Sequence, residues 1–153
     1  MKNLLTIILI LLVIPVVAQT ESNRQDNFNL KDGKYALEGY DAVSYFQGDE
    51  PLKGKSEFTS KYKGVYYRFA TKANQEAFKK NPGKYEPAYG GWCAYAMAKG
   101  QKVKIDPETY KIIDDQIYVF YNFNFTNTLK SWNKDEGNLK TKADSEWGKI
   151  IEM

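Results

Sequence analysis

One cysteine and no histidine limit the chemistry that this chain can perform. The absence of His removes the usual Ser-His-Asp and Cys-His forms of nucleophilic catalysis, and with them the commonest metal ligand. Cys93 stands in the run WCAYAMAK, residues 92–99, with Met97 one helical turn further on. The pair allows three interpretations: core side chains, a soft two-atom site for Cu(I), or a redox or nucleophilic thiolate at Cys93. Core packing is preferred, because a copper site needs a third ligand and a thiolate needs an activating group.

A candidate ligand pocket is assigned to residues in and near two glycine-containing stretches. Aromatic side chains with polar tips line many small-ligand sites, and adjacent glycines let the backbone approach a bound group closely. No catalytic residue is assigned and no cofactor is expected, with copper held by Cys93 and Met97 as the alternative. The six candidate pocket residues are Tyr40, Asp41, Gly90, Gly91, Cys93 and Tyr95.

Alternating apolar residues predict two β-hairpins, each closed by a two-residue turn. The first turn is Lys63 with Gly64, and the second is Asp114 with Asp115. In the second hairpin both faces of the last strand are apolar, which is typical of a strand covered on both sides. The predicted strands are residues 58–62, 65–69, 110–113 and 116–121, and two further short strands are predicted at residues 35–37 and 42–46.

Helices are predicted after each hairpin. Thr71 is a suitable N-cap for a helix over residues 72–80, which ends at Asn81 before Pro82. A short helix is predicted over residues 92–99, and two more follow the second hairpin. No internal repeat is evident. The last helix has an apolar face made of Leu139, Ala143, Trp147 and Ile150.

The first 18 residues have the features of a secretory signal peptide. Lys2 gives a positive start, an apolar run follows, and residues 16–18, VVA, form a small-residue cleavage site. The run is short for a membrane span. We therefore expect cleavage near Ala18 and an exported mature protein, periplasmic or secreted. Residues 19–27 are polar without periodicity and are expected to form a disordered leader, so that residues 28–153 form a single domain.

The charge balance is mild. The chain has 22 basic and 19 acidic residues, a net charge of +3. Such a balance, with lysines scattered among acids, gives no support to nucleic-acid binding. The sequence has no polybasic or amphipathic segment that would hold the mature chain on a membrane, and no stable membrane insertion is expected. The expected partner is a small molecule or an envelope protein.

Residues 62–85, YKGVYYRFATKANQEAFKKNPGKY, resemble the YHS domain: a hairpin ending in Tyr-x-Phe, a helix with a late Phe, then Asn-Pro-x-x-Tyr. Residues 39–46, GYDAVSYF, are similar to the opening of that domain, and residues 89–119 to an extension found in exported YHS proteins. The resemblance implies a small α+β fold, with an antiparallel sheet of short hairpins, helices packed on it and a C-terminal helical extension. It also implies a non-enzymatic binding module.

Metal-binding relatives of this domain place Cys residues in the opening segment and at the entry to the helix. The matching positions of this chain are Ser44, Ala70 and Asn74. A tetrahedral zinc site needs several converging thiolates or imidazoles, and none of these three residues supplies one. The resemblance therefore implies a domain that has kept its shape and lost its metal site.

Overall fold

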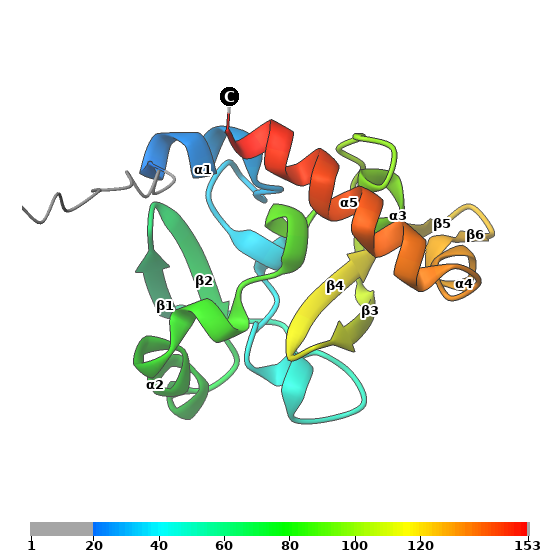
Figure 1. Ribbon diagram of the computed structural model, residues 1–153. Helices are drawn as coiled ribbons and strands as arrows, with labels where there is room; N and C mark the ends of the chain where they lie inside the picture. Colours follow the sequence, from blue (N-terminus) through cyan, green and yellow to red (C-terminus); the bar gives the residue numbers. More distant parts are fainter. Residues whose placement is uncertain (1–19, 153) are drawn as a thin grey trace, which may run out of the picture.

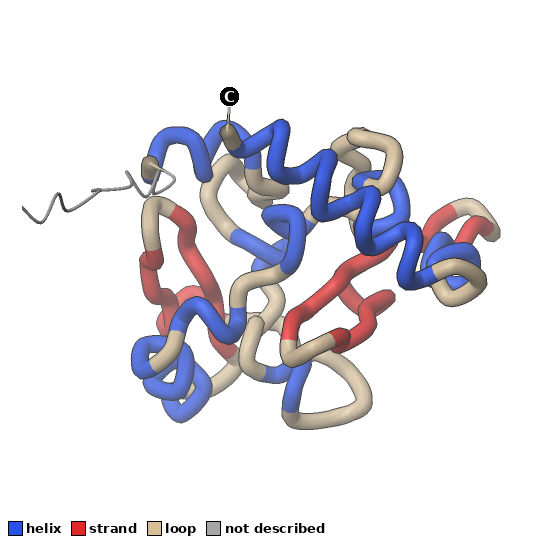
Figure 2. Tube along the Cα trace, viewed as in Figure 1, coloured by secondary structure: helices blue, strands red, loops and turns tan. Residues whose placement is uncertain are grey.

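The computed structural model describes residues 20–152 and shows an α+β fold, as the sequence predicts (Figures 1 and 2). Its strands form three separate two-stranded antiparallel sheets, with helices packed around them. The predicted signal peptide lies outside the described residues. The main elements are α1 Glu21–Asn27, β1 Lys55–Tyr62, β2 Val65–Phe69, α2 Lys72–Lys80, α3 Ala94–Met97, β3 Asp106–Ile113, β4 Gln116–Phe120, β5 Asn122–Phe123, β6 Thr126–Asn127, α4 Thr128–Trp132 and α5 Glu136–Ile151.

Both predicted hairpins and the helix after the first are confirmed. β1 pairs with β2 around Lys63 and Gly64, and β3 pairs with β4 around Asp114 and Asp115. All four turn residues have positive φ, as two-residue hairpin turns require. The hydroxyl of Thr71 accepts from the backbone N–H of Asn74 at 3.1 Å and so caps α2 at the predicted residue.

The predicted disordered leader is wrong for residues 21–27, which form α1. Thr20 caps this helix, and Arg24 is buried at its centre. Arg24 forms an ion pair with Glu86, donates from Nε to the carbonyl of Lys63 at 2.9 Å, and stacks on the ring of Phe28. The helix is therefore held by its contacts with distant parts of the chain, which composition alone does not reveal.

Two predicted short strands are also wrong. Residues 36–39 and 44–46 form 3-10 turns, the first with Leu37 and Glu38 in the left-handed region at φ 52° and 55°. Leu37 is 1 % exposed, so burial of its side chain holds a backbone conformation that a non-glycine residue rarely adopts. The predicted helix over residues 92–99 is confirmed only for its central turn, α3.

The structure overturns the expectation that the chain has no internal repeat. A first module, residues 35–80, and a second module, residues 87–132, run through the same succession of elements. Each begins with an isolated parallel bridge to its own hairpin, from Tyr35 to Tyr66 and from Pro87 to Ile117. Each continues into a 3-10 turn with two left-handed residues, Ala36–Gly39 and Ala88–Gly91, and then into a short helical turn.

The two hairpins correspond pair for pair. In the first module the register joins Lys55 to Phe69 and Tyr62 to Val65, with an irregularity after Lys55. In the second it joins Asp106 to Phe120 and Ile113 to Gln116, with the irregularity in the equivalent place. By the same equivalence, Asp41 of the first module corresponds to Cys93 of the second. Their backbone N–H groups donate to Leu52 at 2.8 Å and to Val103 at 3.0 Å, respectively.

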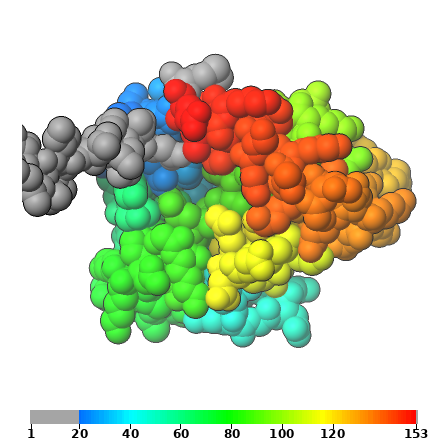
Figure 3. Space-filling view, in the orientation of Figure 1, coloured from blue at the N-terminus to red at the C-terminus, as the bar shows by residue number. Residues whose placement is uncertain are grey.

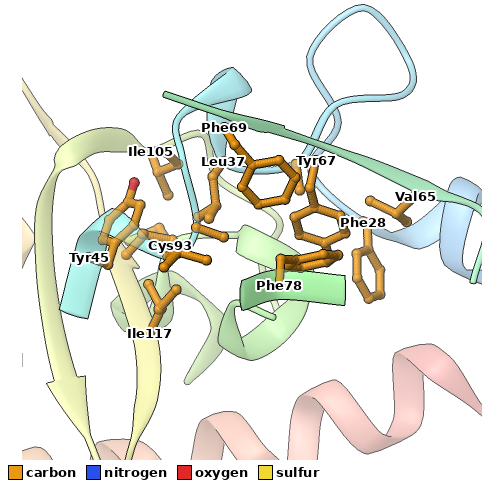
Figure 4. Packing of buried hydrophobic residues seen from close by; sticks show 14 of the residues in the cluster. Phe28, Leu37, Tyr45, Val65, Tyr67, Phe69, Phe78, Cys93, Ile105 and Ile117 are labelled. Atoms are coloured by element: carbon orange, nitrogen blue, oxygen red, sulfur yellow. The ribbon is translucent and has the colours of Figure 1, made fainter. Parts of the chain in front are cut away.

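The buried apolar residues form two clusters. The larger joins the two modules and includes Leu37, Tyr67, Phe78, Cys93 and Ile117 (Figure 4). The smaller lies between the second module and the C-terminal helices, and it includes Tyr118, Phe120, Trp132 and Ala143.

Helix α5 crosses the molecule above β4 and reaches α1, and it covers much of one face (Figures 1 and 3). The apolar face predicted for it is confirmed. Ala143 is buried, while Leu139, Trp147 and Ile150 pack against the smaller cluster. Within residues 20–152, no helix combines the length and the apolar character that a membrane crossing requires.

Candidate functional site

A cavity of about 200 Å³ lies where the short helix α3 meets the chain that leaves β4. Its walls combine apolar groups with a few polar ones that could orient a ligand. Cys93 and Tyr95, two of the six candidate pocket residues, line this cavity together. The other lining residues are Ala96, Lys99, Gln101, Val103, Tyr121 and Thr128.

Cys93 forms the inner wall of this cavity without being accessible to solvent. Its side chain is 0 % exposed, so a water molecule in the cavity does not touch it. Sγ accepts from the backbone N–H of Tyr121 at 3.3 Å and lies 3.4 Å from the Thr128 hydroxyl. The thiol therefore ties α3 to the start of α4, and its neighbours are core residues such as Leu37 and Ile117 (Figure 4).

Met97, the other residue of the candidate copper pair, is buried in a different apolar cluster. It packs with Phe120 and Trp132, whereas Cys93 packs in the larger cluster. Among residues 20–152, no group of three or more His, Cys, Asp or Glu side chains is placed to hold a metal ion.

Asp41 is a fully buried carboxylate, at 0 % exposure, that binds four N–H groups. Oδ1 accepts from the backbone of Val43 at 2.9 Å and of Ser44 at 3.3 Å. Oδ2 accepts from the backbone of Ala70 at 2.8 Å and from Nδ2 of Asn74 at 2.7 Å. The carboxylate thus ties the 3-10 turn at Ser44 to the junction between β2 and α2.

Ser44, Ala70 and Asn74 are the three positions that the resemblance to the YHS domain aligns with metal-ligand cysteines. The structure brings all three to the Asp41 carboxylate, each through an N–H group. An N–H group donates a hydrogen bond and has no lone pair for a metal ion. The three positions therefore converge on an anion supplied by the chain itself.

A similar arrangement recurs at Cys93, with two longer contacts in place of the four hydrogen bonds of Asp41. The Tyr121 N–H bound by Cys93 is the counterpart of the Ala70 N–H bound by Asp41. Thr128, in the helix that follows, approaches Cys93 as Asn74 approaches Asp41. The two sites are thus equivalent positions of the repeated module, one closed by a carboxylate and one by a thiol.

The remaining candidate residues lie away from the Cys93 cavity. Tyr40 donates from its hydroxyl to Oε1 of Glu108 at 2.8 Å. Desolvation, together with this carboxylate, raises the pKa of the Tyr40 hydroxyl to about 12. Tyr40 is therefore a permanent donor to Glu108 at neutral pH and links η1 (Ala36–Gly39) to β3.

Gly90 and Gly91 have structural partners. Their carbonyls accept from the backbone and from the side-chain amide of Asn29, at 2.9 and 3.0 Å. Gly90 also lines a second, polar cavity of about 240 Å³ between α1 and α5, which Arg24 and Asp144 line as well. The missing side chain of Gly90 makes room for two rings, since an added Cβ would lie 2.8 Å from atoms of both Phe28 and Trp147.

We expect Gly90→Ala to lower the free energy of unfolding by about 2–3 kcal/mol, because a methyl group would push two packed rings apart at a left-handed residue. Gly33→Ala is the matched control. Gly33 has a similar φ, +67° against +59°, but nothing within 4 Å of an added Cβ. Urea denaturation of both variants separates backbone strain from the clash, and equal midpoints would show that the rings do not depend on Gly90.

Chelation of metal ions is expected to leave the fold unchanged. The converging positions already bind the Asp41 carboxylate, so the melting temperature should be the same with and without EDTA. Elemental analysis of the same protein should find neither zinc nor copper at one atom per chain. A lower melting temperature in EDTA would reveal a metal that stabilises the fold.

Sequence reasoning missed the partners that define both sites. Asn74 was considered only as a lost ligand, while Tyr121 and Thr128 were not singled out at all. A signal exists for the first site: Thr71 fixes the start of α2, which places Asn74 in its first turn, facing the end of β2. Nothing in the sequence indicates that Thr128 lies against Cys93.

No family model, curated protein or solved structure matches this chain. The arrangement of the two modules and the cavity at Cys93 therefore carry the functional argument.

Proposed function

We propose that this chain is an exported, non-enzymatic binding module of the YHS type, in which the ancestral metal site is replaced by the hydrogen-bonded Asp41 carboxylate. The ligand is a small molecule held in the Cys93 cavity. The observation that carries the proposal is the cavity itself, where Cys93 and Tyr95 lie together with space for a ligand. The convergence of Ser44, Ala70 and Asn74 on Asp41 supports the relationship to the family.

The shape and lining of the cavity indicate the kind of ligand. A cavity of about 150 Å³ lined by apolar side chains is known to hold benzene, so about 200 Å³ accommodates a ring with a small substituent. Val103 and Tyr121 offer apolar contact, while Lys99 offers a donor to a polar end; the Thr128 hydroxyl already donates to the Tyr121 carbonyl at 3.0 Å. The expected ligand is therefore a small amphiphilic molecule with an oxygen-bearing end, such as a substituted phenol.

The proposal is tested by titrating the protein with p-cresol and following backbone amide signals by NMR. We expect saturable shifts at Ala96, Val103 and Thr128, which line the cavity. Val103→Phe should abolish the shifts by filling the space. Leu52→Phe is the matched control, because Leu52 is the counterpart of Val103 in the first module and lines a different cavity.

Two results would contradict the proposal. The first is the absence of any saturable shift up to the solubility limit of p-cresol. The second is a set of shifts that persists unchanged in Val103→Phe, which would place the probe elsewhere.

A further inference from the structure

The β5–β6 hairpin exposes two phenylalanines that neither apolar cluster uses. Phe125 is fully exposed and Phe123 is 36 % exposed. Neither ring belongs to the two clusters. The hairpin stands out from the body of the molecule beside α4 (Figure 1). Phe125 is therefore fully available to a surface outside the chain, whereas Phe123 is partly available, since its ring also packs edge-on against Tyr121, with the ring centres 5.1 Å apart.

The repeat identifies this hairpin as an addition to the second module. In the first module only Ala70 and Thr71 separate β2 from α2. In the second module, β5 and β6 stand between β4 and α4. The first module has no counterpart of this hairpin and still closes its core, so the fold does not require it.

The tip of the hairpin has an unfavourable backbone conformation. Asn124 and Phe125 form the turn, and both lie in the left-handed region at φ 50° and 62°. Turns of this kind prefer glycine at the second position, and a bulky residue there is rare. Phe125 thus combines an unfavourable φ with a fully exposed ring, a combination that indicates a function rather than a role in folding.

One lysine lies against these rings, and the neighbouring stretches of the chain carry further lysines without ion pairs. Lys104 places Nζ 4.7 Å from the centre of the Phe123 ring. The two stretches that meet at the Cys93 cavity, residues 94–105 and 121–134, contain no Asp or Glu. Asp106, at the base of the hairpin, is bound to Thr109 and Asn122. Within the described part of the chain none of the lysines of these stretches forms an ion pair; they are Lys99, Lys102, Lys104, Lys130 and Lys134.

We propose that the β5–β6 hairpin docks the protein reversibly on an anionic lipid surface, with Phe125 and the exposed part of Phe123 entering the interface and Lys104 facing lipid phosphates. Aromatic rings suit the interfacial region, and lysines close to an anionic surface add electrostatic attraction. A two-residue tip is too small for a stable protein interface, which needs about 800 Å² on each partner. Lys104 reaches Phe123 only on folding, since the two residues lie in stretches that are separate in the sequence. This docking does not depend on a ligand in the Cys93 cavity.

The experiment measures flotation of the mature chain, from Gln19 onward, with lipid vesicles. This chain contains all the described residues and lacks the apolar segment that could itself enter a bilayer. We expect binding to vesicles of phosphatidylglycerol and phosphatidylcholine, little binding to phosphatidylcholine alone, and weaker binding at high salt. Phe125→Gly should reduce binding roughly tenfold and Lys104→Gln about fivefold.

Phe125→Gly is a sharp test because glycine relieves the strained turn, so this variant should fold at least as well as the parent protein. The matched controls are Leu52→Gly, which removes another exposed apolar side chain, and Lys31→Gln, which removes another exposed lysine. Both should bind like the parent protein. Equal binding to neutral and anionic vesicles would overturn the proposal, as would unchanged binding of Phe125→Gly. A change of oligomeric state in Phe125→Gly, without an effect on flotation, would assign the hairpin to contacts between copies instead.

Discussion

Replacement of Asp41 by alanine is expected to lower the free energy of unfolding by about 3–5 kcal/mol, the range for breaking a buried charged network. The carboxylate binds four N–H groups at 0 % exposure. Alanine would leave three of these donors without an acceptor, since only the Ser44 N–H also donates to the Asp41 carbonyl, at 3.1 Å. Each unsatisfied buried donor costs free energy. The first module should therefore lose the connection between its 3-10 turn and α2.

Asp41→Asn refines this test, because it keeps the size of the side chain and exchanges one oxygen for an NH₂ group. That group would face at least two donors, so the variant should also be destabilised, though less than Asp41→Ala. Asp49→Ala, in an exposed loop, serves as the control and should shift the stability by less than about 0.5 kcal/mol. Chemical denaturation of the three variants measures these differences in the free energy of unfolding. An Asp41→Asn variant as stable as the parent would show that the four hydrogen bonds contribute little.

Phe78→Ala is expected to cost about 4–5 kcal/mol, the upper part of the range for a buried aromatic residue. Phe78 is 1 % exposed and lies at the centre of the aromatic part of the larger cluster. Its ring centre is 4.6 Å from that of Tyr67 and 5.0 Å from that of Phe69, in tilted geometry. Removal of the ring would open a cavity between α2 and β2 and would also remove the favourable ring pairs.

The same substitution at Phe125 is the matched control, because that ring is fully exposed. Phe125→Ala should leave the denaturation midpoint nearly unchanged, whereas Phe78→Ala should lower it strongly with a similar dependence on urea concentration. If the two variants unfolded at the same midpoint, α2 would not be packed on the first hairpin as described.

Local sequence patterns were sufficient to predict the two main hairpins, helix α2 and the apolar face of α5. The hairpin strands follow a period of two, and their turns carry residues that tolerate positive φ. The start of α2 depends on Thr71 and its end on Pro82, both readable without tertiary information. The face of α5 was predictable because Leu139, Ala143 and Trp147 recur at helical spacing.

Tertiary contacts decided the elements that the sequence did not predict. Residues 35–37 were predicted to form a short strand, but burial of Leu37 holds residues 36–39 in a 3-10 turn with left-handed residues. The polar α1 forms a helix because Arg24 is buried against two residues outside it. Phe28 directly follows the helix, and Glu86 is distant in the sequence.

The internal repeat was missed because its modules share few residue types. The shared residues lie at the ends of the 3-10 turn. An alanine opens each turn, Ala36 or Ala88, and a glycine closes it, Gly39 or Gly91. The equivalent positions Asp41 and Cys93 differ completely in chemistry. Their relationship is visible only in the backbone and in the hydrogen bonds that each accepts.

The candidate site was predicted in part. Of the six candidate pocket residues, the structure places Cys93 and Tyr95 in one cavity, Gly90 at another, and Tyr40 in a hydrogen bond to Glu108. Asp41 is the centre of a structural network. The six residues come from equivalent stretches of the two modules, and the structure does not bring their side chains together in one pocket.

Cys93 lines the candidate binding cavity, and we predict that its thiol is unreactive in the folded protein. The decisive measurement is the rate of alkylation of Cys93 by iodoacetamide in the folded protein at neutral pH. Because the side chain is 0 % exposed and Sγ accepts from Tyr121, we expect alkylation at least about a hundredfold slower than in urea-unfolded protein, limited by local opening. Alkylation of the folded protein as fast as that of the unfolded chain would contradict this prediction and favour a thiol enzyme.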